Sequence, residues 1–285
     1  MHVNDGGYPG ALGCRAAVVA AKRAGARAVL VVHNQTRPPS ADPFERVLDR
    51  LVSRDADVAV TATERASASL GARLPRVPRR VIRDGVPAAS ASRPRAEVRR
   101  ELGLSDGEVV WVMTALFEER KGHAVLLEAA ARLSSPCRFV LVGDGAERPR
   151  IEKAAAERGL SSKFLFLGMR ADARDVAAAG DGFVLPSIHS EDMPLAILDA
   201  MALGRPVVST RLAGIPEEVD HGVTGLLAEP GDAAGLADAL ERLTRDAALR
   251  ASMGAAGFDR FREKFELGAM ARSYAELYRE LAEKS

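Results

Sequence analysis

Apolar and polar positions follow a repeating order along this chain, in which short apolar runs alternate with longer segments of helical period. Between the runs, apolar residues recur every three to four positions, for example over 10–24 and 43–54. This order is typical of βαβ units, whose parallel strands are buried on both faces. The sequence therefore predicts an α/β fold with parallel sheets flanked by helices. The predicted strands are 28–32, 58–61, 109–113, 139–142, 164–167, 182–185 and 206–209.

The series of strands and helices stops and restarts once, which predicts two domains. The first series ends in a short strand at Val81-Ile82 and runs into a linker rich in Pro and Arg. A second series begins at Val109, and three helical segments follow residue 232. We expect two Rossmann-like domains and a C-terminal helix that packs back toward the first of them. Their predicted boundaries are 1–88, 89–265 and 266–285.

Composition limits the class of protein. Of 285 residues, 47% are hydrophobic and 28% are charged, which is ordinary for soluble globular proteins and excludes a disordered chain. No apolar run reaches the roughly 20 residues that cross a bilayer, and residues 1–7 lack the features of a signal peptide. Cys14 and Cys137 have neither CxxC nor metal-ligand spacing. We therefore expect a cytoplasmic protein.

The net charge of +1 hides an asymmetry along the chain. Residues 1–100 contain 18 Lys and Arg against 9 Asp and Glu, whereas the remainder carries an excess of acids. A solvated, arginine-rich linker between Arg73 and Arg100 explains part of this excess. Alternatively, the first part presents a basic face that attracts an anionic membrane or a phosphate-bearing substrate. The small net charge argues against a dedicated nucleic-acid-binding protein.

Several familiar motifs are incomplete or absent. The run Gly143–Arg148 begins like a dinucleotide fingerprint but has Arg at its sixth position, where a third glycine would allow close helix–strand packing. Asp55-Ala56-Asp57 matches the metal-binding DxD pattern of some sugar transferases, but a solvated turn between a helix and a strand explains it better. No GxSxG, Walker or HExxH sequence occurs. An NAD enzyme, a serine hydrolase, a P-loop kinase and a zinc enzyme are therefore disfavoured.

The segment from Leu185 to Met201 combines features of an anion site and a sugar site. It starts at the carboxyl end of a predicted parallel strand, where open α/β sheets bind their ligands. Pro194 suits the first turn of the following helix, and the amides of residues 193–196 would present positive dipole density to a diphosphate. Glu191 precedes the helix, and Asp199 lies eight residues later, which corresponds to about two helical turns. Their carboxylates would accept hydrogen bonds from a polyhydroxyl ligand.

Further fragments occur in a fixed order along the second part of the chain. Together with Glu191 and Asp199, they make the stretch from Val109 to Tyr278 resemble the C-terminal domain of family 4 retaining glycosyltransferases of the GT-B fold. The first part resembles only the latter half of the family's N-terminal domain. The resemblance implies two Rossmann-like domains of GT-B type, the N-terminal one incomplete. The matching fragments are Arg120-Lys121-Gly122-His123, Leu141–Gly145, Phe166-Leu167-Gly168, Pro186-Ser187, Asp199–Val208, Gly214–Val219 and Gly222–Leu227.

The resemblance implies a nucleotide-diphosphate sugar as donor, held mainly by the C-terminal domain. Glu191 is then the first acid of the family's E-x7-E motif and faces the transferred sugar. Asp199 fills the second position, where the family usually has a ribose-binding Glu. Lys121 matches the lysine that neutralises the diphosphate. Thr114-Ala115-Leu116 occupies the place where the family often adds an arginine, so either Arg120 compensates or phosphate binding is weaker.

Other contacts follow from the same resemblance. His33 matches a histidine near the donor sugar, although a structural role at the end of a strand also fits it. The backbone around Gly168, Met169 and Arg170 would line the base. The resemblance implies no metal ion and no further cofactor. The remaining donor-binding residues are Met193, Pro194, Leu195 and Ala196.

The family resemblance predicts transfer of a sugar to an acceptor hydroxyl with retention of the anomeric configuration. Because the N-terminal domain matches only in part, the alternative is a catalytically impaired nucleotide-sugar-binding remnant or a fragment of a longer glycosyltransferase. The basic first part is compatible with a lipid-linked or otherwise anionic acceptor. It is also compatible with peripheral contact at the inner face of a membrane.

Overall fold

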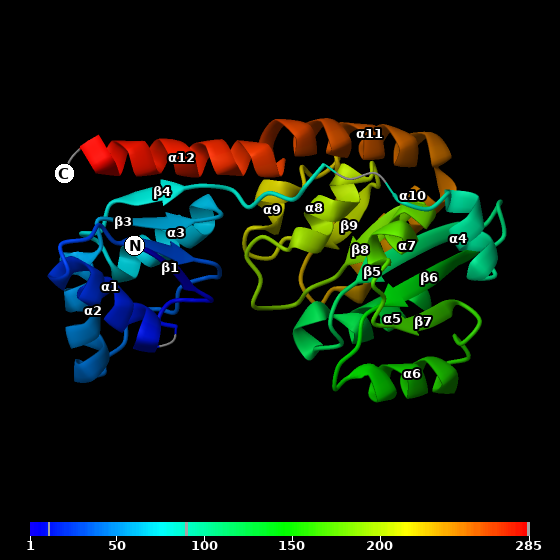
Figure 1. Ribbon diagram of the computed structural model, residues 1–285. Coiled ribbons are helices and arrows are strands. Elements are labelled where there is room, and N and C mark those ends of the chain that lie inside the picture. The colour runs from blue at the N-terminus through cyan, green and yellow to red at the C-terminus, as the bar shows by residue number, and fades with distance from the viewer. Residues whose placement is uncertain (11, 89–90, 284–285) are drawn as a thin grey trace. The chain divides into compact units, whose positions relative to one another are not determined.

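The computed structural model describes residues 1–10, 12–88 and 91–283 (Figure 1). The chain divides into two compact units, each built on one parallel sheet. The second unit comprises Val86–His189 and Pro194–Glu266. The first unit comprises Met1–Gly85, Ser190–Met193 and Leu267–Ser285, so three separate stretches of the chain form it.

The first unit contains a four-stranded sheet with helices on both faces. Its strands lie in chain order and are all parallel: β1 (His2–Asp5), β2 (Val29–Val32), β3 (Val58–Thr61) and β4 (Arg79–Val81). Side chains of a strand alternate between faces, and both sets are buried on β2. One set packs with α1 (Leu12–Arg23), α2 (Pro43–Asp55) and α3 (Glu64–Arg73). The other set packs against Leu277 of α12 (Leu267–Glu283).

The second unit contains a six-stranded sheet whose order reverses once. The strands lie in the order β10-β9-β8-β5-β6-β7, and all neighbours are parallel. The chain moves outward from β5 in one direction and then returns to β8 on its other side. This pair is therefore the topological switch point, where α/β sheets of this kind bind ligands. The strands are β5 (Val109–Thr114), β6 (Cys137–Val142), β7 (Phe164–Gly168), β8 (Gly182–Leu185), β9 (Val207–Thr210) and β10 (Gly225–Ala228).

Helices cover both faces of this second sheet. Val110 and Val112 of β5 pack with α4 and α7 on one face. The fully buried Trp111 instead donates its indole N–H to Thr244 Oγ1 of α10 across 3.0 Å. Aspartates cap α10 and α11, because Asp232 and Asp246 each accept backbone N–H groups of the first turn. The helices are α4 (Arg95–Glu101), η1 (Glu119–Lys121), α5 (His123–Ala130), α6 (Arg148–Glu157), α7 (Ala173–Ala179), α8 (Leu195–Ala202), α9 (Ile215–Glu218), α10 (Ala233–Arg245) and α11 (Ala247–Lys264).

The predicted fold class is confirmed, and two details differ from expectation. The prediction of a solvated turn at Asp55-Ala56-Asp57 was wrong: Asp55 is buried and ion-paired with Arg54, and Asp57 accepts hydrogen bonds from Arg27 and the Ala28 N–H. The strand β10 had not been predicted. No helix among the described residues combines the length and the apolar character needed to span a membrane.

Candidate functional site

The turn that carries Lys121 is in direct contact with the loop after β8. Gly122 has φ of 75°, and a Cβ placed there would lie 1.9 Å from the Pro186 carbonyl oxygen. The Ile188 N–H donates to the Arg120 carbonyl across 2.8 Å. Since β5 and β8 are neighbours in the sheet, these contacts join two distant sequence motifs at the switch point.

The helix that follows this loop begins with a positive end. α8 starts at Leu195, one residue later than predicted, and Pro194 takes the N-cap position with φ of −71°. First-turn amides have no acceptor within their own helix, and the helix dipole adds positive charge at this end. The first turn of α8 contains no acidic side chain that would neutralise this charge. The amides of Leu195 and Ala196 are therefore suited to bind a diphosphate.

The acidic segment just before α8 belongs to the first unit. Glu191 is 6% exposed, so its carboxyl group does not lie in bulk solvent. The neighbouring Asp192 accepts hydrogen bonds at Oδ1 from Thr63 Oγ1 (2.6 Å) and from Gln35 Nε2 (2.9 Å). Thr63 also caps α3 by accepting the Ala66 N–H. These bonds fix the backbone on the C-terminal side of Glu191.

A buried histidine lies beside Lys121 in the chain. The His123 ring stacks on Phe117 with 4.1 Å between ring centroids. Burial lowers the pKa of His123 to about 4, and the positive charge of Lys121 adds to this effect. His123 is therefore neutral at physiological pH. The positive charge of this turn comes from Arg120 and Lys121, and Arg120 forms an ion pair with Glu118.

The loops after β6 and β7 approach one another through backbone atoms. The Gly143 N–H donates to the Gly168 carbonyl across 2.9 Å. A Cβ at Gly143 would lie 1.9 Å from the Ala115 carbonyl oxygen, so glycine permits this contact. Met169 is 70% exposed, whereas the Arg170 guanidinium is bound to Asp172 and Glu101. Arg170 thus has its backbone, rather than its side chain, available for a ligand.

Asp199 has a basic partner on a neighbouring helix. Arg174 of α7 donates to Asp199 Oδ1, and both side chains are about one third exposed, at 35% and 37%. The pairing fixes the direction of the Asp199 carboxylate. A ribose that binds at this position would meet Asp199 already engaged by an arginine.

His33 belongs to a polar group of the first unit. Its Nε2 lies 3.0 Å from Asn4 Oδ1, and its backbone N–H donates to the Asp5 carbonyl. Asp84 is half-buried, which raises the pKa of its carboxyl, while the charge of His33 opposes that rise. The strand-end position of His33 therefore places it with Asn4 and Asp84, neither of which we had singled out from the sequence.

The predicted site residues are distributed over both units. Three of them, His33, Glu191 and Met193, group with the first unit. Sequence reasoning gave no role to Asp192, Arg174 or His123. Two of them had a signal, because Asp192 directly follows Glu191 and His123 belongs to a fragment that matches the family. Within the second unit lie Arg120, Lys121, Gly168, Met169, Arg170, Pro194, Leu195, Ala196 and Asp199.

Comparison with known proteins identifies the family. The sequence profile described as glycosyl transferases group 1 matches residues 107–246, which contain Lys121, Glu191 and Asp199. Residues 107–246 belong to the group 1, or family 4, glycosyltransferases. The glycosyltransferase match covers the whole six-stranded sheet, from β5 to β10.

Curated relatives within the group 1 glycosyltransferases share about a third of the sequence. The alpha-D-kanosaminyltransferase of Streptomyces kanamyceticus is 31% identical over 251 residues, which cover 84% of this chain and 64% of that protein. The lipopolysaccharide core biosynthesis glycosyltransferase LpsE of Rhizobium meliloti is 38% identical over 61% of this chain and 50% of its own length. The chain thus spans about half to two thirds of these relatives.

Solved structures support the GT-B fold of this chain. Sucrose-phosphate synthase from Thermosynechococcus elongatus has a TM-score of 0.83 and 25% identity, and the match covers 100% of this chain and 74% of that chain. Anabaena Alr3699/HepE in complex with UDP has a TM-score of 0.84 and 23% identity, over 98% of this chain and 78% of that chain. The second likeness shows the fold alone.

Proposed function

We propose that this chain is a retaining glycosyltransferase that moves a sugar from a nucleotide-diphosphate sugar to an acceptor hydroxyl. The observation that carries the proposal is the packing of the Lys121–Gly122 turn against Pro186 and Ile188, in the loop that leads to α8. Two sources of positive charge, an ammonium group and a helix N-terminus, therefore belong to adjoining segments at the switch point.

The leaving group sets the first chemical requirement. As the glycosidic bond to the diphosphate breaks, the sugar takes on oxocarbenium character and negative charge develops on the departing oxygens. The Lys121 ammonium and the amides of Leu195 and Ala196 would stabilise that charge. Because His123 is neutral, it does not compete with Lys121 for the diphosphate.

The sugar sets the second requirement. Glu191 would accept hydrogen bonds from sugar hydroxyls and hold the ring for same-face attack by the acceptor. The hydrogen bonds from Thr63 and Gln35 to Asp192 keep the adjoining backbone in place, so little reorganisation is needed at Glu191 when the donor binds. Asp199, directed by Arg174, would accept hydrogen bonds from the ribose. His33 would lie near the donor sugar, with Asn4 fixing its ring.

The donor and acceptor follow from relatives and from charge. UDP-sugars are the first donors to test, because solved relatives carry UDP and glucose. Residues 1–100 have twice as many basic as acidic side chains, which favours an anionic or lipid-linked acceptor and peripheral attachment at the inner membrane face. Because the inner membrane face borders the cytoplasm, we place the reaction in the cytoplasm.

Thermal shift with a panel of UDP-, GDP-, ADP- and dTDP-sugars tests the proposal, followed by a product assay with the nucleotide sugar that binds. A ligand that binds only the folded state raises the melting temperature. We expect one base to give a clear shift, and Lys121→Met to reduce it. A shift without transfer to any acceptor would favour a nucleotide-sugar-binding protein. The absence of a shift with every nucleotide would overturn the proposal.

A further inference from the structure

The outer face of α1 and α2 exposes apolar side chains to solvent. Leu12, Phe44 and Val47 are 53%, 60% and 49% exposed. On α2, Phe44 and Val47 share one side of the helix with Leu48 and Leu51, because residues three, four and seven positions apart align. This apolar ridge does not contribute to the buried core, which α2 reaches through Val52.

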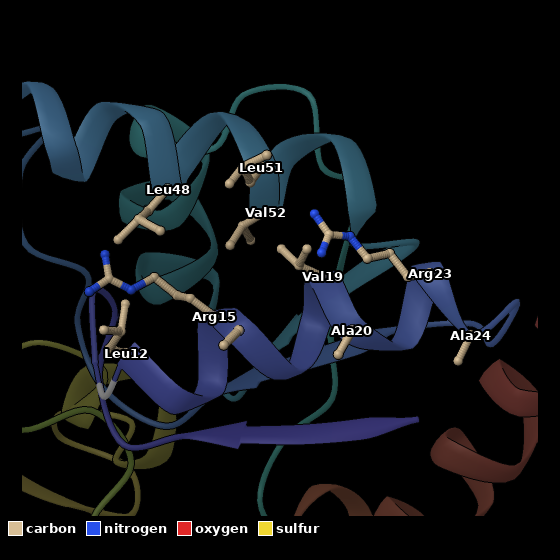
Figure 2. Close-up of a pocket in the computed structure, with 10 residues that line it drawn as sticks. Leu12, Arg15, Val19, Ala20, Arg23, Ala24, Leu48, Leu51 and Val52 are labelled. Carbon is tan, nitrogen blue, oxygen red and sulfur yellow. The ribbon is translucent and has the colours of Figure 1, made fainter.

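A groove of about 540 Å³ runs beside the ridge, between the two helices. Figure 2 shows Leu48, Leu51 and Val52 of α2 directed toward α1, with Arg15 and Arg23 extending from α1 near the two ends of the groove. Its walls are thus apolar in the middle and cationic at the ends. Such a groove fits a molecule that has both an apolar chain and a negative charge.

Arg15 is the unusual member of this groove. Its side chain is only 7% exposed, yet Nε and Nη1 have no hydrogen-bond acceptor among the described residues. The charge of Arg15 acts on Asp5, whose pKa is raised by burial, but no ion pair joins the two. Because a buried, unpaired guanidinium is costly, an anion in the groove would satisfy it.

The charges around the ridge also favour an anionic partner. Two acidic residues of α2, Glu45 and Asp49, each form an ion pair of 2.8 Å with Arg73. By contrast, Arg46 and Arg50 on α2 have no ion pair with any residue that the structure describes. Arg50 lies about one helical turn from Val47, and together with Arg46 it lines a second hollow beside α2. The other basic residues of this hollow are Arg54, Arg73 and Arg76, and its acid is Asp49.

We propose that this α1–α2 face, comprising Leu12, Arg15, Arg23, Phe44, Arg46, Val47 and Arg50, binds the surface of a bilayer that contains anionic phospholipid. Phe44 and Val47 enter the boundary between headgroups and acyl chains, and the arginines contact lipid phosphates. Arg15 holds the phosphate of a lipid whose chain lies along the groove. The proposal deepens the membrane contact proposed above and is independent of the transfer chemistry.

Two other occupants fit the face less well. A second copy of the chain would bring two arginine-rich faces together, which like-charge repulsion opposes. A nucleic acid would use the arginines but leave the apolar ridge and groove without a role. Only an amphipathic anionic surface matches both the apolar and the basic parts.

Co-sedimentation of the full chain with vesicles tests the proposal, using phosphatidylglycerol mixed with phosphatidylcholine, and phosphatidylcholine alone. Each arginine near such a surface contributes about a fivefold gain in affinity. We expect Arg46→Gln with Arg50→Gln to weaken binding to the mixed vesicles about 25-fold, and Phe44→Ser with Val47→Ser to weaken it at least about tenfold. Arg132→Gln and Phe258→Ser, on exposed positions of the second unit, are matched controls and should bind like the wild type.

The Arg15→Gln variant separates a ligand role from a structural one. Without lipid, it should melt no lower than the wild type, since a buried unpaired charge is removed; with mixed vesicles it should bind several-fold more weakly. Equal binding of the wild type to both kinds of vesicle, or full binding by the Phe44 and Val47 variant, would overturn the proposal. Self-association that this variant abolishes would instead assign the face to a second copy. Nucleotide-induced thermal shift, measured on the same samples, reports the donor site separately.

Discussion

The Thr63 hydroxyl donates a hydrogen bond of 2.6 Å to Asp192 Oδ1, which connects the start of α3 to the residue after Glu191. Asp192→Ala removes the acceptor and leaves the Thr63 and Gln35 donors unsatisfied. We expect kcat to fall about 10- to 100-fold, since a small displacement of Glu191 disturbs the alignment of the sugar. Calorimetry should show UDP affinity within about twofold of the wild type, because the diphosphate contacts lie elsewhere.

Thr63→Ser is the matched control for this relationship. It keeps the hydroxyl that bonds Asp192 and caps α3, so kcat should remain close to that of the wild type. Unchanged turnover in Asp192→Ala would show that the hydrogen bonds to Asp192 do not position Glu191.

Asp199 is expected to bind the nucleoside rather than the diphosphate. Asp199→Ala should weaken UDP binding about tenfold, the effect of losing charge-assisted hydrogen bonds to the ribose. Its affinity for inorganic pyrophosphate should not fall. Arg174→Gln, which only releases the Asp199 carboxylate, should have a smaller effect on UDP. Equal weakening of UDP and pyrophosphate by Asp199→Ala would contradict a ribose contact.

Gly122 holds the Lys121 turn against Pro186. Gly122→Ala combines a positive φ of 75° with a Cβ only 1.9 Å from the Pro186 carbonyl oxygen, so the turn must move. We expect urea unfolding to show a loss of at least about 3 kcal/mol. Gly103→Ala is the control, since its φ of 63° is similar but open space surrounds it. It should lose only about 1 kcal/mol, and similar losses in both variants would refute the contact.

His123 makes the stability of the second unit depend on pH. Its folded-state pKa of about 4 lies below the ordinary value, so the unfolded chain binds a proton that the folded chain rejects. The free energy of unfolding should therefore fall as the pH drops from about 6.5 toward 4, by up to about 3 kcal/mol. Urea titrations of the wild type and His123→Phe, which keeps the stacking on Phe117, measure this difference. Parallel pH profiles for the two proteins would exclude His123 as the cause.

Strand positions were predictable because burial leaves a direct trace in the sequence. The runs at 58–61 and 182–185 coincide with β3 and β8, since strands buried on both faces are apolar at most positions. β10 escaped prediction because Gly225-Leu226-Leu227-Ala228 contains no β-branched residue and begins with glycine. Its strand state depends on pairing with β9, which is a tertiary contact.

The candidate site was predictable only where a local pattern carries the chemistry. Glu191, Pro194 and Asp199 stand at helix-related spacing, so the sequence alone relates them to one another. The bond between Thr63 and Asp192 spans 129 positions of the chain, and no local pattern encodes it. Arg174, the partner of Asp199, lies on a different helix, so no local pattern encodes this ion pair either.

The central claim is that Glu191 acts on the sugar during transfer. The most direct measurement is the rate of product formation by Glu191→Gln, using the nucleotide sugar that binds the wild type. The substitution keeps the size of the side chain and removes its charge. We predict a fall in kcat of at least about 100-fold with the dissociation constant of the nucleotide unchanged. Turnover at the wild-type rate would contradict the account.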